Sequence, residues 1–471
     1  MATFLDSGRI FELRSLEKLY NRDEFTFAVV YGRRRVGKTS LISEFINRDN
    51  KKAIRFTATE NTSTVNLENF SQSVFSVFPK FSSLGRFPSW ESAFDYIVEQ
   101  SEGRKLIVFI DEYPYLAKAQ PSISSEIQRY IDLVLQDTNI MLILCGSSMS
   151  FMENQVLGYQ SPLYGRRTAQ YKIKPLDYYD SAEFFMNASI EDKLLGYAVT
   201  GGIPQYLNTI SKSPTVEEGI KDAFFSKDGF LYEEPQNLLK QELREPAMYN
   251  AIITAIANGA TKMNEIALKV NEKDNKVATY IKNLIDLGIL EKNVPMLSKG
   301  GRSGIYRIKD NMYRFWYRFV PGAFTLIDNR YEHTYEEKVR PFVNDFMGHV
   351  FEDVCMQYLT RLNVKDRLPF LFTDIGKWWG GNPITKKETE IDIIASSGDK
   401  LILGECKWRN KKFGPDTYKG LKERAAMFID KDIHFFIFSR SGFTVSLTEE
   451  AEKDDRLTLV GLNDLFNISF P

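Results

Sequence analysis

Gly32-Arg33-Arg34-Arg35-Val36-Gly37-Lys38-Thr39-Ser40 is the stretch that decides the fold of the N-terminal half. Residues 32–39 match the pattern GxxxxGKS/T in full, between the apolar run FAVVY and the amphipathic run TSLISEFI. A strand, a glycine-rich loop and a helix in this order bind phosphates, because backbone N–H groups and the helix N-terminus point at the anion. Lys38 is expected to reach the β- and γ-phosphates, and Thr39 to bind Mg²⁺. The nine residues therefore predict a site for ATP and Mg²⁺ rather than a chance match in a turn.

An acidic pair follows the next long apolar run. KLIVFI at 105–110 is expected to be a buried strand, and Asp111 and Glu112 come directly after it. Ligands of open α/β sheets bind at the carboxyl ends of the strands. Asp111 is expected to hold the metal ion, directly or through water, and Glu112 to orient or deprotonate the attacking water. With Lys38 they form the predicted catalytic set; an acidic turn is the alternative for a lone Asp-Glu pair.

Two further segments offer polar groups to this site. The apolar run at 140–145 ends in Gly146-Ser147-Ser148, where a hydroxyl is placed to position the lytic water, unless these residues only turn the chain. The loop PLYGRR at 162–167 offers Arg166 or Arg167 to a γ-phosphate of its own or a neighbouring subunit. A solvated charge pair is the alternative for these arginines.

The apolar periodicity predicts an alternation of strands and helices through residues 1–174. The expected strands are 25–31, 53–57, 105–110, 140–145 and 169–173, and the expected helices are 38–47, 63–78, 90–100 and 123–137. A mostly helical segment, 175–243, follows. The pattern predicts a parallel sheet covered on both faces.

Residues 244–312 have the outline of a winged helix-turn-helix. Two short helices and a third at about 275–287 precede two short strands around the turn SKGGRSG. Its third helix carries Lys276 and Lys282 but also Asp274 and Asp286, and its wing carries Lys299 and Arg302. This is a weak phosphate-binding face, so contact with DNA and contact with a protein both stay open. The aromatic run YRFWYRF at 313–319 is expected in a core or a seam between domains.

A last α/β domain is expected at 335–471. Its predicted elements are a long helix at 336–361, strands at 369–373, 390–396, 400–406 and 433–439, and a helix at 416–429. The run KWRNKK at 407–412 offers cations to phosphates and Trp408 to a nucleic-acid base, or else forms a solvated turn with one anchoring aromatic.

This domain carries a carboxylate–lysine constellation. Glu352 lies on the long helix, Asp392 on the strand EIDIIA, and Glu405 and Lys407 on the strand LILGECKW. Residues two apart on a strand point to one face, and a hairpin would bring Asp392 beside Glu405. Clustered carboxylates form a hard oxygen site, so Glu352, Asp392 and Glu405 are predicted metal ligands. Asp392, Glu405 and Lys407 are the predicted catalytic residues for phosphodiester cleavage.

The first half resembles the archaeal-type ATPases of the STAND branch of AAA+ proteins. The resemblance is carried by GRIFELRSLEKL, GRRRVGKTSL, FIDEYPYL, GSS, SPLYGRRT and TGGIPQYL, within about 1–240. It implies a P-loop NTPase with an AAA+-like parallel sheet and a helical lid, acting as a nucleotide switch, with a winged helix after the lid. It further implies that Gly202 and Pro204 replace the usual lid arginine and that residues 9–11 lie near the adenine.

The second half resembles the PD-(D/E)XK restriction-endonuclease-like α/β fold and, more closely, the domain of unknown function that follows archaeal-type ATPases. YRFWYRFV, GHVFEDVC, TEIDIIA and GECKW carry this resemblance over about 310–471. Ile391 stands where proline often precedes the aspartate. The chain is thus expected to be an ATP-hydrolysing switch joined to a nuclease-like domain that binds or cleaves nucleic acid. The alternative is a signalling or scaffold ATPase whose last domain is a catalytically silent binding module.

Bulk composition limits the partners. The chain has 471 residues, a formal net charge of −1 and three cysteines, none in a CxxC spacing. We expect no structural zinc site, no signal peptide and no membrane span. We expect a cytoplasmic location. ATP is the expected small-molecule partner. DNA, a protein partner and a homo-oligomer stay open.

Overall fold

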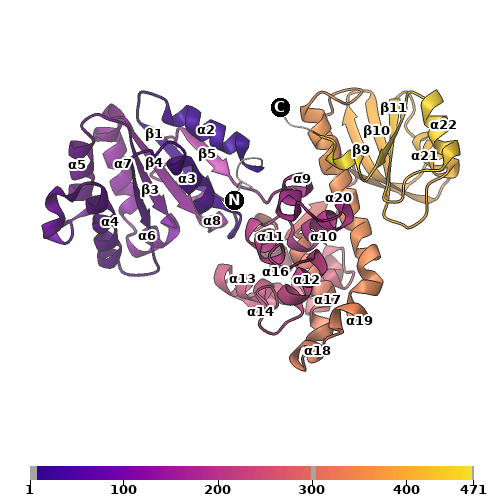
Figure 1. Ribbon diagram of the computed structural model, residues 1–471, viewed down its shortest axis with the longest axis horizontal. Coiled ribbons are helices and arrows are strands. Elements are labelled where there is room, and N and C mark those ends of the chain that lie inside the picture. Colours follow the sequence, from indigo (N-terminus) through magenta and orange to yellow (C-terminus); the bar gives the residue numbers. More distant parts are fainter. Residues whose placement is uncertain (1–7, 299–303, 469–471) are drawn as a thin grey trace. The chain divides into compact units, whose positions relative to one another are not determined.

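The computed structural model describes residues 8–298 and 304–468 (Figure 1). The chain divides into two compact units, one of Met1–Pro175 with Ile203–Gln205 and one of Leu176–Gly202 with Tyr206–Pro471. The finer predicted division at 174, 243, 312 and 335 stays a prediction.

The first unit is built on a five-stranded parallel sheet of order β2-β3-β4-β1-β5. Its strands are β1 (Thr26–Tyr31), β2 (Ala53–Thr57), β3 (Leu106–Asp111), β4 (Ile140–Gly146) and β5 (Ala169–Lys172). The three central strands, β1, β3 and β4, are buried along their whole length, which explains their unbroken apolar sequences. The predicted parallel P-loop sheet is confirmed.

Helices cover both faces of this sheet (Figure 1). They are α2 (Ile10–Tyr20), α3 (Lys38–Asn47), α4 (Ser63–Val77), α5 (Trp90–Ser101), α6 (Tyr113–Ala119) and α7 (Ile123–Leu133). The Thr62 hydroxyl caps α4 and a Ser89 capping box begins α5, which fixes where these helices start. The predicted helix 123–137 is shorter than expected, because α7 ends at Leu133 and a 3₁₀ turn continues to Asp137.

In the second unit, three helices and a two-stranded sheet follow one another as the winged-helix pattern predicts. They are α14 (Pro246–Ala257), α15 (Met263–Val270), α16 (Asp274–Asp286), β6 (Leu290–Asn293) and β7 (Ile305–Ile308), with β6 antiparallel to β7. Lys299 and Arg302 lie outside the described residues. We call the described residues from β6 to β7, which are 290–298 and 304–308, the wing.

The aromatic run forms α17 (Asn311–Phe319), begun by an Asp310 side chain that caps the Tyr313 amide. Tyr313, Phe315 and Trp316 are almost completely buried, and the Trp316 indole donates to the Tyr232 carbonyl over 2.6 Å. The prediction that this run belongs to a core is confirmed.

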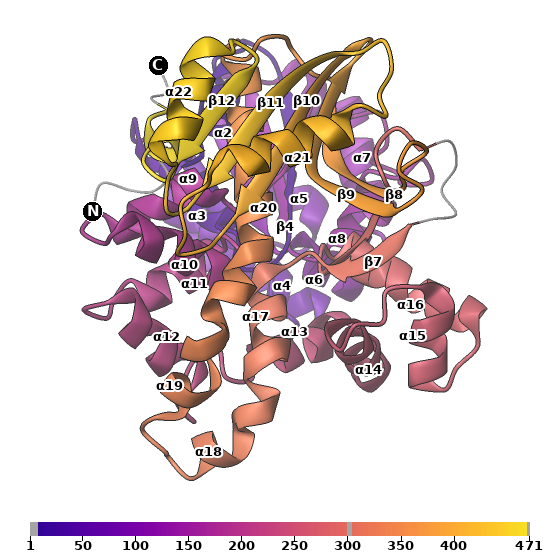
Figure 2. The same ribbon diagram turned by 90° about the vertical axis from the view of Figure 1, so that its right-hand side faces the viewer.

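The C-terminal sheet has the order β12-β11-β10-β9-β8, with α21 and α22 beside it (Figure 2). Its strands are β8 (Asp374–Gly381), β9 (Glu388–Ser397), β10 (Lys400–Lys407), β11 (Asp432–Ser439) and β12 (Leu457–Gly461), and its helices are α20 (Val343–Val364), α21 (Pro415–Ala425) and α22 (Val445–Lys453). β9 and β10 form the predicted antiparallel hairpin. α21 and α22 pack on the face that bears Leu401 and Leu403.

Two predictions for this region are wrong. The helix expected at 336–361 is interrupted: α19 (Thr334–Lys338) ends early, a 3₁₀ turn occupies Arg340–Phe342, and α20 begins only at Val343. Pro341 lies in that turn, where it ends one helix before the next begins. The strand expected at 369–373 is not one, and the strand is instead β8, from Asp374 to Gly381.

Candidate functional sites

The phosphate-binding loop connects β1 to α3 in a form that requires glycine. A Cβ added to Gly32 would meet the Ile173 carbonyl oxygen at 2.3 Å, so the loop lies directly against the chain after β5. Gly37 has a φ of 89° and is the N-cap of α3, which begins at Lys38. Arg35 also takes a positive φ, 68°, so the loop curls at two places. These turns leave the helix N-terminus at the end of the loop, where an anion is favoured.

Lys38 is folded over this loop. Its side chain is 5% exposed, and Nζ donates to the Arg33 carbonyl over 2.9 Å. Burial lowers the pKa of Lys38, while the nearby Cys145, Glu112 and Asp111 oppose that shift. The ammonium is therefore partly desolvated, which strengthens its attraction for a phosphate.

Thr39 and Asp111 are hydrogen-bonded to each other. The Thr39 hydroxyl donates to Oδ2 of Asp111 over 2.7 Å, although the two residues are 72 positions apart. Asp111 is 3% exposed, at the end of β3, while Thr39 and Ser40 are exposed in the first turn of α3. A hydroxyl beside a carboxylate at the foot of a phosphate loop is the oxygen donor pair that Mg²⁺ prefers. The residues present therefore fit the predicted metal.

Glu112 is held by the next strand of the sheet. The Ser147 hydroxyl donates to Oε2 of Glu112 over 2.8 Å, and the Ser147 amide lies 3.4 Å from the same oxygen. Glu112 has a left-handed backbone, with φ 50° and ψ 44°. Non-glycine residues in this region carry strain that often marks a functional site. The predicted GSS segment thus supplies a direct partner to the predicted water-orienting residue.

Arg9 supports the loop from outside the motif. Its guanidinium is 4% exposed and donates to the Val36 carbonyl over 3.1 Å and to the Lys174 carbonyl over 2.6 Å. This arginine joins the loop to the chain after β5. The motif gave no signal for this role; the resemblance alone drew attention to residues 9–11.

The arginines near the loop have partners within the first unit. Arg34 donates to the Tyr115 hydroxyl over 2.9 Å. Arg166 donates two bonds to Asp132, over 2.7 and 2.6 Å, and that pairing raises the pKa of Arg166. Arg167 stacks over the Tyr164 ring. Of the two candidate fingers, Arg166 is thus the one engaged in a bidentate ion pair.

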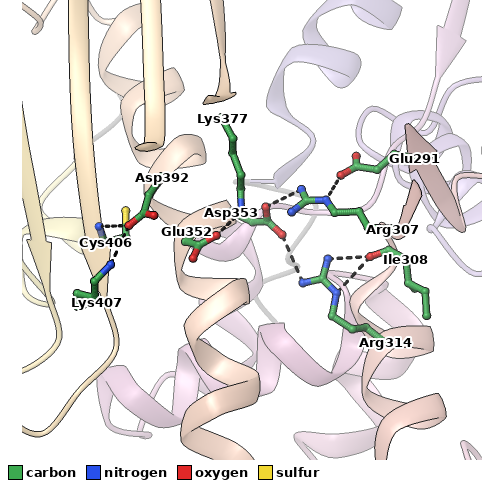
Figure 3. Close-up of polar contacts among 10 residues, drawn as sticks. All are labelled: Glu291, Arg307, Ile308, Arg314, Glu352, Asp353, Lys377, Asp392, Cys406 and Lys407. Carbon is green, nitrogen blue, oxygen red and sulfur yellow. Dashed lines mark hydrogen bonds and ion pairs between the residues drawn. The ribbon is translucent and has the colours of Figure 1, made fainter. Parts of the chain in front are cut away.

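The C-terminal domain brings together three of its predicted residues. Lys407 Nζ lies 2.7 Å from Oε1 of Glu405 and 3.2 Å from Oδ2 of Asp392. The same Asp392 oxygen accepts the Cys406 amide over 2.9 Å (Figure 3). The hairpin therefore places Asp392 beside Glu405 and Lys407, as its predicted register requires.

Glu352 does not join them in a metal site. It pairs with Lys377, and burial raises its pKa while Lys377 opposes the rise (Figure 3). Within residues 8–298 and 304–468, no group of three or more histidine, cysteine, aspartate or glutamate side chains is arranged to hold a metal ion. Each of the three carboxylates has a side-chain cation as its partner instead: Lys377 for Glu352, Lys407 for Asp392, and both Lys407 and Arg424 for Glu405. The predicted ligand set Glu352, Asp392 and Glu405 does not fit a metal in this arrangement.

Trp408 is unavailable to a base. It is 7% exposed, its ring lies 5.3 Å from that of Phe351, and its indole donates to Asn344 over 3.2 Å. The guanidinium of Arg440 covers the ring at 5.0 Å. The anchoring-aromatic alternative is the correct one for this residue.

Sequence families match both halves of the chain. A model described as an ATPase domain predominantly from Archaea matches residues 4–210. A model described as archaeal and bacterial proteins of unknown function matches residues 316–425. Of the described residues, no helix has both the length and the apolar character needed to span a bilayer.

Three known proteins illustrate the likeness. An uncharacterized protein of Methanocaldococcus jannaschii is 35% identical over 424 residues, which cover 87% of this chain and 90% of that protein. The solved structure of a Walker-type ATPase of Pyrococcus abyssi is 22% identical, with a TM-score of 0.51, covering 66% of this chain and 95% of that one. The solved structure of the Aeropyrum pernix ORC1 protein in complex with DNA is 15% identical, with a TM-score of 0.36. The match covers 68% of this chain and 94% of that one.

The P. abyssi structure supports the P-loop fold, and the M. jannaschii relative extends over nearly the whole chain. Because the family model covers the loop and acid pair described above, and the relative matches 87% of the chain at 35% identity, the chain belongs to the family of ATPases found predominantly in Archaea.

Proposed function

We propose that this ATPase is a nucleotide switch whose C-terminal half binds nucleic acid. The observation that carries the switch is the meeting of Thr39 with Asp111 beside Lys38. Lys38 would contact the β- and γ-phosphates, together with the backbone amides of residues 32–40. Thr39 and Asp111 would hold Mg²⁺, which supplies charge neutralisation to the phosphates when bound.

Glu112 would act on the attacking water. Its carboxylate is fixed by Ser147, so one oxygen is oriented by that bond and the other is left to accept the water's proton. Glu112→Gln is expected to bind ATP as the wild type does and to slow hydrolysis at least about a hundredfold, the lower range for a lost general base. Wild-type turnover in this variant would remove Glu112 from the reaction.

Exposed cations on α16 and its N-cap support the binding of nucleic acid. Lys273, Lys276 and Lys282 are all exposed on or beside this helix, with Asn275 and Thr279 between them. Lys276 pairs with Glu272 over 2.6 Å, so Lys273 and Lys282 are the better candidates for phosphate contacts. Lysines that contact phosphates release counterions, and this makes the affinity depend on salt.

The test is the salt dependence of duplex DNA binding by the full chain. Replacing both Lys273 and Lys282 by serine is expected to weaken binding and to reduce the slope of log K against log salt by about 2. Lys453→Ser, at an exposed position in α22, is the matched control. If the double variant and the control showed equal affinity and equal slope, the proposal that α16 contacts DNA would be refuted.

The scaffold ATPase is the second candidate, and the ion pairs of the C-terminal centre favour it over a nuclease. Asp392 and Glu405 share Lys407, and Glu405 also binds Arg424. Cleavage of a DNA and RNA panel with Mg²⁺ or Mn²⁺, with and without ATP, separates the two. Cutting that disappears in Asp392→Ala would establish the nuclease, and its absence from the intact protein would leave a binding module.

A further inference from the structure

The C-terminal centre carries its own counter-charges. Three carboxylates are each paired with a side-chain cation: Glu352 with Lys377, Asp392 with Lys407, and Glu405 with both Lys407 and Arg424. Three negative and three positive charges leave the cluster formally neutral. A carboxylate cluster that attracts a divalent cation needs uncompensated negative charge. The unexpected member is Lys377, which no motif of the sequence singled out.

A β-bulge brings Lys377 to the centre. Gly376 of β8 pairs with Ile394 of β9, but Trp378 pairs with Ile391, so two residues of β9, Asp392 and Ile393, lie opposite the single Lys377. Bulges re-aim side chains and are enriched beside functional sites. Here the bulge occurs at Asp392, a predicted catalytic residue, and it places Lys377 opposite Asp392.

The wing holds this bulge. The Met296 amide donates to the Lys377 carbonyl over 2.8 Å. A Cβ added to Gly376 would meet the Met296 side chain at 2.9 Å, so that side chain lies against β8. Met296 follows β6, and the wing is therefore attached to the strand that carries Lys377.

A second attachment joins the wing to α20. Arg307 of β7 pairs with Glu291 of β6 and, over 3.0 Å, with Asp353, the residue next to Glu352 (Figure 3). Arg314 of α17 lies 3.6 Å from the other Asp353 oxygen. Burial opposes the charge of Asp353, yet Arg307, Arg314 and Lys377 together hold its pKa below the ordinary value. Lys377 therefore acts on both neighbouring carboxylates of α20.

We propose that Lys377 is an internal cation that occupies Glu352 and thereby excludes a divalent ion from the centre, and that the wing holds it there. This goes beyond nucleic-acid binding, because it concerns what keeps the centre metal-free. Removing the Lys377 charge leaves three carboxylates with two cations, so the centre gains affinity for a divalent ion. Removing Arg307 leaves Asp353 with one cation fewer and draws Lys377 from Glu352 towards Asp353. The affinity of the centre for a divalent ion then rises by a smaller amount.

The experiment measures Mn²⁺ binding to the full chain by calorimetry, with the nucleotide site inactivated by Asp111→Asn in every protein. Lys377→Met is expected to bind Mn²⁺ about tenfold more tightly than the parent, and Arg307→Gln more tightly by a smaller factor. Lys377→Arg keeps the cation and should retain the parent affinity. Lys422→Met, which removes a lysine paired with Glu450 away from the centre, is the control.

Arg424→Met removes one of the two cations paired with Glu405, and its result distinguishes the ways in which the proposal can fail. Tighter binding in Arg424→Met with no gain in Lys377→Met overturns the role of Lys377 and leaves a metal-capable centre. No Mn²⁺ binding by the parent or by any variant overturns both the internal-cation proposal and the nuclease candidate, while α16 binding to DNA is tested independently by its salt slope. A variant that fails to fold is recognised by its circular dichroism, and Lys377→Gln then replaces Lys377→Met.

Discussion

The Ser147 hydroxyl donates a 2.8 Å hydrogen bond to the Glu112 carboxylate, and this joins the ends of two adjacent strands, β4 and β3. Ser147 is 4% exposed, so Glu112 accepts from an oriented hydroxyl inside the protein rather than from a solvated group at the surface. A fixed carboxylate beside the phosphate loop meets the geometric requirement for a water-orienting residue.

Ser147→Ala is expected to reduce ATP turnover about tenfold and leave ATP affinity unchanged. The variant removes the bond that orients Glu112, and one neutral or charge-assisted hydrogen bond contributes on the order of 1–2 kcal/mol, which corresponds to a factor of about ten in rate. Phosphate release gives kcat, and fluorescent-nucleotide titration gives the affinity.

Ser148→Ala is the control for that experiment. Ser148 follows Ser147 directly and is half-buried, but no bond from its side chain to Glu112 is found in the described part of the chain. Equal loss of turnover in the two variants would mean that the segment, and not the Ser147 hydroxyl, is responsible.

Lys38→Ala should abolish ATP binding. The Lys38 ammonium is 5% exposed and folded over the loop by its bond to the Arg33 carbonyl, so no other side chain can take its place without rebuilding the loop. Titration with a fluorescent ATP analogue measures the loss. Lys118→Ala removes a lysine that pairs with Glu60 in the same unit and should bind normally. If Lys38→Ala bound ATP as tightly as the wild type does, the assignment of this loop as the ATP site would be refuted.

Gly32→Ala tests the close approach of the loop to the chain after β5. The added Cβ would lie 2.3 Å from the Ile173 carbonyl oxygen, and a backbone atom cannot move aside as a flexible side chain does. The loop must therefore shift, and ATP affinity is expected to fall at least about tenfold, since misplacing binding groups by about 1 Å is costly. Gly420→Ala, in α21 with no atom near the added Cβ, should leave the affinity unchanged. Undiminished binding would show that the loop tolerates the shift.

The sequence predicted the parallel sheet and the loop of the first unit well, because short motifs follow strands with unmistakable apolar runs. The range 38–47 was predicted for α3 and is its observed extent. Contacts between distant segments left no such signal. Arg9 reaches the Val36 carbonyl across 27 positions, and Lys377 reaches Glu352 through a bulge that periodicity does not encode. The strand predicted at 369–373 is wrong for a similar reason, because PFLF at 369–372 is apolar but the sheet pairs the following residues, 374–381.

Trp408→Ala is expected to destabilise the C-terminal domain rather than to weaken nucleic-acid binding directly. Trp408 packs between Phe351 and Arg440 and is 7% exposed, so truncating it opens a cavity between β10 and α20. Such truncations cost about 3–5 kcal/mol, and the thermal midpoint of the variant should fall by several degrees. Trp408→Phe keeps most of the ring and should lose less. Arg409→Ala, at the exposed neighbouring position, is the control and should unfold as the wild type does. If Trp408→Ala melted as the wild type does but lost affinity for duplex DNA, the ring would be acting on a base, and the buried anchor described above would be the wrong account of it.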